Sequence, residues 1–438
     1  MKMTVGAISL GCNKNRVDTE SALGLLQNQG FQITSDPAMA DILLVNTCGF
    51  ILSAREESIN TILDMAEYKK TGRCRLLVVT GCLAQRYENE LMKEIPEIDL
   101  LLGVNQYARL GEMIQKALKG KREHLCSDDY SYFEQARLLT TPFYSAYTRI
   151  GEGCSNRCTF CAIPLIRGPY RSRNEDSILQ EVKSLAEHGV REHILVAQDT
   201  TRYGTDQGGH TQLPSLMKKI SEIPGVDWLR VLYCYPDETN EQLLDLLAET
   251  PNICPYLDIP VQHINSDILH RMHRRGTRED ILRCVREAKS RGLTLRTTMI
   301  VGFPGETEDQ FEELMDFVRE AEFDRLGAFA YSPEEDTPAA KMKDQIPEEI
   351  KEERLERLMA LQQKISLRKN LDRIGSTEKV LVTDCNEKGL CLGRSMREAP
   401  ETDGEIIFNA GSSLPEIGSF VNVRLTRAEP YDLYGELL

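Results

Sequence analysis

The 438-residue sequence has no long hydrophobic run and no excess of positive charge. No window approaches the roughly 20 apolar residues that a membrane-spanning helix needs. The first residues pass directly to Gly11 and Cys12, without the cleavage site of a signal peptide. We therefore expect a cytoplasmic protein with no membrane partner. Its 53 basic and 68 acidic residues leave a net charge of −15, which disfavours general nucleic-acid binding, because non-specific contact with phosphates needs a basic face.

Two common nucleotide-binding motifs are also missing from the first part of the chain. Turns that contain Gly11, Gly49 and Gly81 follow apolar runs, but none of them forms GxGxxG or GxxxxGK. A phosphate-binding loop is therefore not expected there.

Cysteine, by contrast, is frequent, and its odd count of 13 fits metal ligation better than a disulfide framework. Cys154, Cys158 and Cys161 form a CxxxCxxC loop with polar neighbours. Three thiolates can hold a 4Fe-4S cluster and leave one iron without a protein ligand, whereas an electron-carrying cluster takes four thiolates. Zinc is the main alternative, although structural zinc sites favour two CxxC pairs that close a tetrahedron.

Residues 1–120 alternate short apolar runs with amphipathic segments, which predicts an α/β domain with a doubly wound parallel sheet. Strands are expected at residues 4–10, 41–45, 75–80 and 100–103, and helices at 16–29, 53–69, 83–94 and 110–118. Cys12, Cys48 and Cys82 each follow one of these strands by two or three residues. Because the carboxyl ends of parallel strands share one edge, we expect a second three-thiolate site, for a cluster or for zinc.

Residues 121–145 are irregular and predict a linker, and residues 146–345 predict a partial TIM-type barrel of six β/α units. Its strands are expected at 146–150, 193–197, 228–232, 256–259, 295–301 and 325–329, and its helices at 177–188, 213–223, 241–249, 278–291 and 309–321. The cysteine loop follows the first of these strands, at the end of the barrel where chemistry takes place.

Further polar residues stand at the strand ends of the barrel. We expect Gln198, Gln262 and Arg296 to line a pocket for an adenosine and an amino acid, although such residues are also common in turns and caps. The basic run at residues 270–275 either attracts anions or is a solvated helix end.

A charged amphipathic helix is expected at residues 346–370, followed by a small antiparallel β-barrel of the oligonucleotide-binding kind at residues 371–438. The barrel strands are predicted at 380–382, 390–392, 406–408, 420–425 and 434–437. This tail has 7 basic and 12 acidic residues, a net charge of −5, which suits a basic protein surface better than an RNA backbone. Seven cysteines outside the two triads have no partner spacing, and most of them are expected to be small apolar residues or inert thiols: Cys74, Cys126, Cys234, Cys254, Cys284, Cys385 and Cys391.

Several segments resemble the radical S-adenosylmethionine enzymes, and within them the methylthiotransferases. The loop 152–161 with the following residues 163–173 resembles the radical-forming domain, residues 9–15, 46–49 and 80–82 resemble the family's N-terminal domain, and residues 380–438 resemble its TRAM domain. One branch of the family modifies an adenosine in tRNA, and the other modifies an aspartate of the small-subunit ribosomal protein uS12. Residues 9–15, 232–236 and 257–263 resemble the second branch, and the acidic tail agrees with it.

The resemblance implies S-adenosylmethionine and two 4Fe-4S clusters as cofactors. The cluster on the CxxxCxxC loop would generate a 5′-deoxyadenosyl radical that takes a hydrogen from the aspartate β-carbon, and the cluster on the first triad would supply the sulfur. Such a C–H bond is not acidic enough for a side-chain base, which agrees with the lack of an evident acid–base pair. A reductant protein such as flavodoxin or ferredoxin and a sulfur donor are implied as partners. The alternatives are a tRNA methylthiotransferase and a non-catalytic iron–sulfur binding protein.

Overall fold

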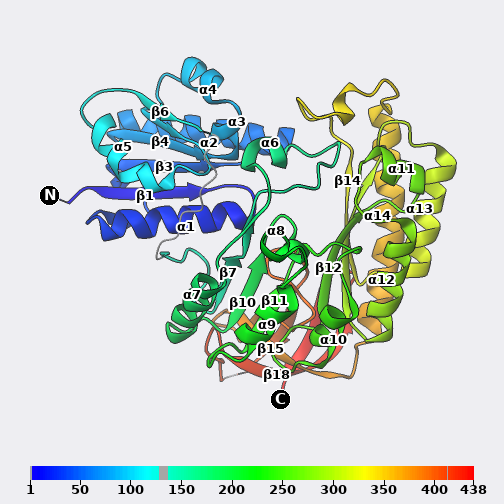
Figure 1. The fold of residues 1–438 in the computed structure, drawn as a ribbon. Coiled ribbons are helices and arrows are strands. Elements are labelled where there is room, and N and C mark those ends of the chain that lie inside the picture. The colour runs from blue at the N-terminus through cyan, green and yellow to red at the C-terminus, as the bar shows by residue number, and fades with distance from the viewer. Residues whose placement is uncertain (1, 128–136, 412) are drawn as a thin grey trace.

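The structure, a computed structural model, describes residues 2–127, 137–411 and 413–438 and consists of three parts (Figure 1). An N-terminal α/β part lies beside the upper end of the central strands, and a small C-terminal barrel lies beneath their lower end. The predicted linker, residues 121–145, falls partly outside the described residues. No helix within the described ranges combines the length and apolar character that crossing a bilayer requires.

The N-terminal part is a six-stranded parallel sheet in the order β2-β1-β3-β4-β5-β6, which confirms the predicted fold class. Its strands are β1 (Thr4–Ser9), β2 (Gln32–Thr34), β3 (Ile42–Thr47), β4 (Leu76–Gly81), β5 (Leu100–Leu102) and β6 (Glu123–Leu125). The three-residue edge strands β2 and β6 were not predicted, because they are too short to show a periodicity, and β6 lies in the segment expected to be a linker.

Helices cover both faces of this sheet. Their bounds are α1 (Asn13–Asn28), α2 (Leu52–Thr71), α3 (Cys82–Arg86), α4 (Glu88–Glu94) and α5 (Leu110–Ala117). Helices α1 and α5 share one hydrophobic core with the sheet, and α2, α3 and α4 share the other. The single helix predicted at 83–94 is divided at Tyr87, whose φ of −127° is not helical.

The central part has six parallel strands in two adjoining sheets, β7-β10-β11 and β12-β13-β14, and confirms the predicted partial barrel. The strands are β7 (Ser145–Arg149), β10 (Glu192–Val196), β11 (Trp228–Val231), β12 (Tyr256–Gln262), β13 (Thr294–Val301) and β14 (Arg325–Ala330). Cys234 N donates a hydrogen bond to Asp258 O at 2.8 Å across the seam between the two sheets. The main helices are α7 (Glu175–Glu187), α9 (Leu213–Ser221), α10 (Glu241–Glu249), α12 (Arg278–Ser290) and α13 (Glu308–Ala321).

Several short elements of the central part were not predicted, and all of them lie in loops that follow its strands. They are β8 (Gly151–Glu152), α6 (Ile163–Arg167), β9 (Arg171–Ser172), α8 (Thr205–Gly208) and α11 (Ser266–Arg271). Their local sequence has too few turns for a helical or strand period to emerge.

The connecting helix α14 (Glu348–Leu371) packs along β14 and α13 and leads to a closed five-stranded barrel. The barrel strands are β15 (Thr377–Cys385), β16 (Leu390–Arg394), β17 (Ile406–Asn409), β18 (Phe420–Ala428) and β19 (Leu433–Leu437). All its ladders are antiparallel as predicted except the one between β17 and β19. Trp228, the first residue of β11, packs on Phe420 with ring centroids 4.7 Å apart, so this barrel lies at the amino-terminal end of the central strands.

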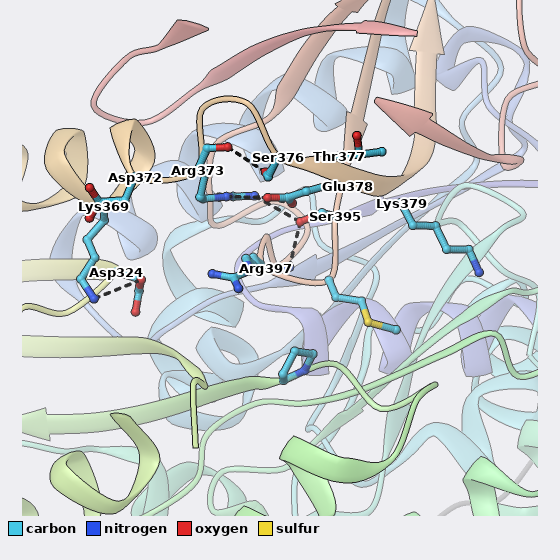
Figure 2. A pocket seen from close by; sticks show the side chains of 12 residues that line it. Asp324, Lys369, Asp372, Arg373, Ser376, Thr377, Glu378, Lys379, Ser395 and Arg397 are labelled. Carbon is cyan, nitrogen blue, oxygen red and sulfur yellow. Dashed lines mark hydrogen bonds and ion pairs between the residues drawn. The ribbon is translucent and has the colours of Figure 1, made fainter. Parts of the chain in front are cut away.

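A polar cavity of 610 Å³ lies where α14 meets the C-terminal barrel (Figure 2). Lys369 and Asp324 form an ion pair on one side of it, and Arg373 pairs with Glu378 on the other. Pro255 and Asp324, which also line the cavity, directly precede β12 and β14. The cavity therefore lies at the end of the central strands opposite to the cysteine loop.

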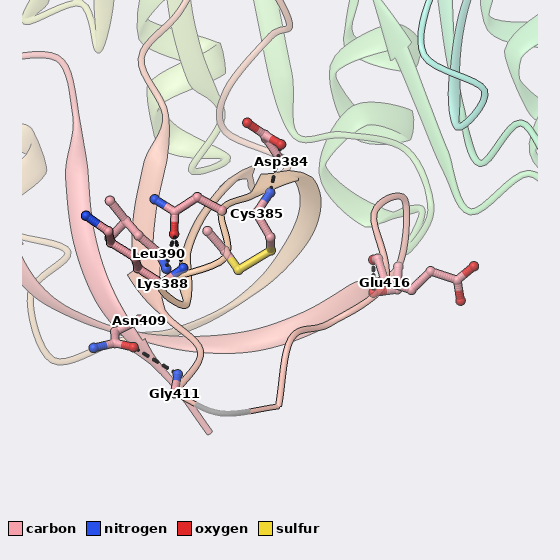
Figure 3. The surroundings of a disulfide bond; sticks show 10 residues. Asp384, Cys385, Lys388, Leu390, Asn409, Gly411 and Glu416 are labelled. Carbon is pink, nitrogen blue, oxygen red and sulfur yellow. Dashed lines mark hydrogen bonds between the residues drawn. A yellow bond between two sulfur atoms is a disulfide. The ribbon is translucent and has the colours of Figure 1, made fainter.

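Cys385 and Cys391 form a disulfide, so the expectation of inert thiols is wrong for this pair (Figure 3). They stand directly opposite each other on β15 and β16, with Cα atoms 4.0 Å apart. The signal in the sequence was their spacing on either side of a short turn at residues 386–389. The other five cysteines outside the triads are free thiols, buried except for the half-buried Cys126.

A buried ion-pair cluster joins the C-terminal barrel to the central part. The Glu192 carboxylate of β10 forms ion pairs with Arg394 of β16 at 2.6 Å and with Arg230 of β11 at 3.1 Å, and all three side chains are buried.

We expect Glu192→Gln to lower the free energy of unfolding by about 3–5 kcal/mol, because it leaves two guanidinium groups without their counter-charge. Chemical denaturation of the cluster-free protein measures this. Glu112→Gln, which breaks only exposed pairs, serves as the control and should change little.

The same carboxylate predicts a dependence of stability on acid pH. Burial alone would raise the pKa of Glu192, but Arg394 and Arg230 outweigh it and hold the pKa at about 2, below its usual 4.5. A carboxyl whose pKa is lower in the folded state stabilises the protein fully above pH 4.5 and loses this effect as the pH falls toward 2. The difference in stability between the native protein and Glu192→Gln should therefore shrink over this range. A difference that stays constant from pH 6 to pH 3 would contradict the assignment.

Candidate functional site

Cys12, Cys48 and Cys82 follow three neighbouring strands of the N-terminal sheet. Cys12 is the residue before α1, Cys48 comes directly after β3, and Cys82 is the first residue of α3, directly after β4. Strand β3 lies between β1 and β4, so the three loops emerge side by side at the carboxyl edge of the sheet. This is the placement that the sequence predicted.

Glycines beside these cysteines allow the three loops to touch. Gly11 has a φ of +82°, and a Cβ atom there would lie 2.7 Å from Cys48 Cβ. A Cβ atom on Gly49 would lie 2.8 Å from the backbone nitrogen of Leu83. The glycines therefore serve the close packing of the cysteine loops.

We expect Gly11→Ala to remove the metal centre of this triad, because the new methyl group would force the loops of Cys12 and Cys48 apart. Iron bound after anaerobic reconstitution should fall to about half of the native value if both triads hold clusters. Gly30→Ala is a matched control, since Gly30 has a φ of +92° in the same domain but no atom within 4 Å of the added Cβ. If the iron content falls equally in both variants, backbone strain alone accounts for the loss.

The second triad lies in the loop between β8 and α6. Cys154 N donates a hydrogen bond to Gly168 O at 3.0 Å, and Cys161 N donates to Cys158 O at 3.0 Å. Cys154 and Cys158 are buried, and Cys161 is half-buried. The loop is thus closed on itself at the carboxyl end of the central strands.

The basic run at residues 270–275 begins as the solvated helix end that was one of its two interpretations, since His270 and Arg271 stand in the last turn of α11 and His270 is exposed. The residues that follow fasten this cysteine loop. Arg274 Nη1 lies 3.5 Å from Cys158 Sγ and donates to the Tyr235 hydroxyl at 2.9 Å. Thr159 N donates to the carbonyl oxygen of Met272 at 2.9 Å. Sequence reasoning did not connect the two segments, since they are more than 100 residues apart.

Two buried thiols of the triads, Cys82 and Cys154, keep their protons near neutral pH in the metal-free protein. Burial raises the pKa of Cys82 to about 12 and that of Cys154 to about 11, so metal binding releases protons from these groups. Within the described ranges no three His, Cys, Asp or Glu side chains stand close enough to hold a single metal ion. A 4Fe-4S cluster binds each thiolate at a different iron, so its ligands do not have to converge on one point.

A cavity of 550 Å³ opens between the N-terminal and central parts. It is lined by residues 50–53, which follow Cys48, by Phe160 of the second cysteine loop, by Gln262 at the end of β12 and by residues 329–332. Among the described residues, the buried atoms Gln262 Oε1 and Tyr331 Oη have no hydrogen-bond partner. A largely apolar cavity with a few unsatisfied polar atoms is typical of a ligand site.

Of the residues predicted to contact a ligand, Gln262 lines this cavity and Gln198 does not. Gln198 follows β10 and precedes Asp199, whose carboxylate accepts a hydrogen bond from Asn156 Nδ2 of the cysteine loop at 2.9 Å. The strand end thus supports the loop through Asp199.

The expectation for Arg296 is not supported. This residue lies near the start of β13, pairs with Asp258 at 2.7 Å and faces Asp403 of the C-terminal barrel at 3.9 Å. It is not among the cavity-lining residues. Its position near the start of the strand places it toward the amino-terminal end of the barrel.

A buried group of four charges joins the N-terminal part to the second cysteine loop. Arg167 of α6 pairs with Asp18 of α1 at 2.9 Å and with Glu152 at 3.0 Å. Arg149 pairs with the same two carboxylates at 2.5 and 2.6 Å. All four side chains are buried. Glu152 and Arg167 flank the cysteine loop in the sequence, which was the only local signal of their importance.

A second, more exposed contact joins the same two parts beyond the cavity. Arg86 and Arg55 pair with Glu334 at 3.5 and 3.4 Å, and the Tyr87 hydroxyl donates to Glu335 at 2.6 Å. Glu334 also lines the cavity, so this contact borders it.

Three family models match the chain. Residues 4–103 match the Uncharacterized protein family UPF0004, residues 148–318 match the Radical SAM superfamily, and residues 374–438 match the TRAM domain. The protein named ribosomal protein uS12 methylthiotransferase RimO from Desulforamulus reducens is 51% identical over 99% of each chain. The protein of the same name from Heliobacterium modesticaldum is 48% identical over 100% of this chain and 96% of its own.

Solved structures share the fold at low sequence identity. The radical S-adenosylmethionine methyltransferase TsrM from Kitasatospora setae superposes with a TM-score of 0.57 at 14% identity, over 88% of this chain and 79% of its own. The cobalamin-dependent S-adenosylmethionine radical enzyme OxsB gives a TM-score of 0.52 at 13% identity, over 82% of this chain and 56% of its own. The full-length similarity to the curated relatives, together with the three matched domains, shows that the chain belongs to the RimO family of radical S-adenosylmethionine methylthiotransferases.

Proposed function

We propose that the protein methylthiolates the β-carbon of an aspartate in ribosomal protein uS12, with a 4Fe-4S cluster at each cysteine triad. The cavity between the two parts supports this most directly, because its wall includes Phe50, two residues after Cys48, and Phe160, the neighbour of Cys161. A substrate side chain in this cavity would stand between a site that forms a radical and a site that supplies sulfur.

The residues around the cavity suit such a reaction. When bound, the cluster on the second triad would supply the electron that cleaves S-adenosylmethionine. Gln262 and Tyr331 offer unsatisfied polar atoms to a polar ligand, and Phe160 and Phe329 cover it with apolar surface. Exclusion of water protects a reactive intermediate from side reactions, while the protein positions the cofactor.

Charge favours a protein substrate over tRNA. The tail carries a net charge of −5, and one of its seven basic residues, Arg394, is already paired with Glu192 of the central part. Glu398 of the tail is likewise buried and paired with Arg325 of the central part, so the rest of the tail keeps its net charge of −5, which disfavours contact with phosphates. The relatives named for uS12 agree with this preference.

The test is an anaerobic incubation of the reconstituted protein with S-adenosylmethionine, sulfide and a reductant such as flavodoxin, ferredoxin or dithionite. Small ribosomal subunits or total tRNA are added in separate reactions. We expect uS12 peptides heavier by one methylthio group and 5′-deoxyadenosine in the first reaction. Methylthio-adenosine in the tRNA reaction alone would establish the other branch. No cleavage of S-adenosylmethionine in either reaction would indicate a non-catalytic iron–sulfur protein.

A further inference from the structure

A continuous line of buried polar contacts runs from the first triad to the second cysteine loop. Cys82 Sγ lies 3.6 Å from Asn15 Oδ1, and Arg167 Nη2 donates to the same oxygen at 2.7 Å. Arg167 Nη1 donates to Glu152 Oε1 at 3.0 Å, and this oxygen also accepts the Gly153 N–H at 3.1 Å. The Arg167 guanidinium is therefore linked to each metal-binding loop through one shared oxygen atom, Asn15 Oδ1 on one side and Glu152 Oε1 on the other.

The charges of this junction balance before any metal centre is added. Arg167 and Arg149 face Asp18 and Glu152, and each of the four side chains is at least 90% buried. Three thiolates and a cluster on the first triad would add negative charge beside Arg167, because its Nη2 atom and Cys82 Sγ contact the same oxygen. Opposite charges within such a distance interact strongly where water is excluded.

We propose that Arg167 is a positioning residue that fixes the two triads relative to each other and stabilises the reduced, more negative state of the cluster on Cys12, Cys48 and Cys82. This inference rests on the proposed function, which assigns a 4Fe-4S cluster to that triad. Net charge and hydrogen bonds near the cysteine sulfurs set the reduction potential of such clusters. A fixed cation raises the potential, and its removal lowers it.

Arg86 offers a control in the other contact between the same two parts. Its guanidinium donates to Gly49 O and Glu335 O and pairs with Glu334. Among the described residues, its hydrogen bonds and ion pairs do not include a sulfur of the triad. Loss of Arg86 therefore loosens the junction without removing the cation that lies next to Cys82.

The first experiment isolates the N-terminal cluster in the full chain by replacing Cys154, Cys158 and Cys161 with alanine. The iron content and the reduction potential, the latter from a redox titration followed by electron paramagnetic resonance, are then compared. The proteins are this parent and its Arg167→Gln, Arg167→Lys and Arg86→Gln variants. We expect Arg167→Gln to lower the equilibrium constant for reduction about tenfold, which is about 59 mV for a one-electron couple. Arg167→Lys, which keeps the charge, and Arg86→Gln should stay near the parent value.

Asp18→Asn should shift the reduction potential in the opposite direction, because it removes a negative charge from the same buried group. Its potential should rise, which decides the question even if Arg167→Gln fails to bind iron. An equal fall in potential in Arg167→Gln, Arg167→Lys and Arg86→Gln would overturn the electrostatic role. If the parent with three alanines binds no iron at all, the assignment of a cluster to Cys12, Cys48 and Cys82 fails, and this inference fails with it.

The second experiment uses the chain with all six cysteines and measures coupling. Each of Arg167→Lys and Arg167→Gln should lower the ratio of methylthiolated uS12 to 5′-deoxyadenosine, because radicals still form while the first triad is displaced from its position relative to the second. The ratio should fall at least tenfold in Arg167→Gln and less in Arg167→Lys. An unchanged ratio in both variants would overturn the positioning role.

Discussion

Cys158→Ala is expected to abolish the formation of 5′-deoxyadenosine from S-adenosylmethionine under reducing, anaerobic conditions. Cys158 is buried in the CxxxCxxC loop, and its sulfur faces the Arg274 guanidinium at 3.5 Å. A three-thiolate site that loses one ligand cannot hold its cluster in the geometry that leaves one iron open. Product formation should fall to the background of a reaction without enzyme, as measured by mass spectrometry of the nucleosides.

Cys254→Ala is the control for this experiment. Cys254 is a buried thiol in the core beneath the amino-terminal end of the central strands, next to Trp228 and Tyr256. Its loss removes a small apolar group but no metal ligand, so 5′-deoxyadenosine should still form. Persistence of this product in Cys158→Ala would refute the assignment of the radical-forming site.

Cys12→Ala is expected to separate the two halves of the reaction. The second cysteine loop is untouched, so S-adenosylmethionine should still be cleaved to 5′-deoxyadenosine. Methylthiolated uS12 should disappear, because the first triad retains only Cys48 and Cys82. Iron after reconstitution should fall from about eight to about four atoms per chain, as expected for two clusters of four irons each.

Cys126→Ala matches Cys12→Ala closely. Cys126 follows β6 at the same edge of the N-terminal sheet, but it belongs to neither triad, and its Sγ atom lies 3.6 Å from the Ala84 carbonyl oxygen. We expect full iron content and methylthiolation in this variant. If Cys12→Ala keeps about eight irons and still modifies uS12, the first triad is not the sulfur-supplying site.

The sequence was sufficient to predict the elements that depend on local pattern. Cys12, Cys48 and Cys82 could be placed at one sheet edge because each follows an apolar strand by a few residues, and parallel topology does the rest. Gln262 could be placed near the ligand cavity for the same reason. The closed C-terminal barrel followed from five short strands with turns between them.

Contacts between distant segments could not be predicted in this way. Arg167 meets Asp18 across 149 positions, and Arg274 meets Cys158 across 116. No periodicity within either segment encodes such a pairing, because the partner is chosen by how the parts pack. The parallel ladder of β17 with β19 and the disulfide between Cys385 and Cys391 are further products of pairing between strands.

The closure of the C-terminal barrel restricts how this domain can meet another protein. Each of its five strands is hydrogen-bonded to a neighbour on both sides, since β15 pairs with both β16 and β18. An extended peptide cannot join such a barrel as an added strand, because no row of free backbone groups remains for it. Partner choice at this domain must therefore depend on side chains at its surface. Surface substitutions should change which partner binds while leaving the backbone framework as it is.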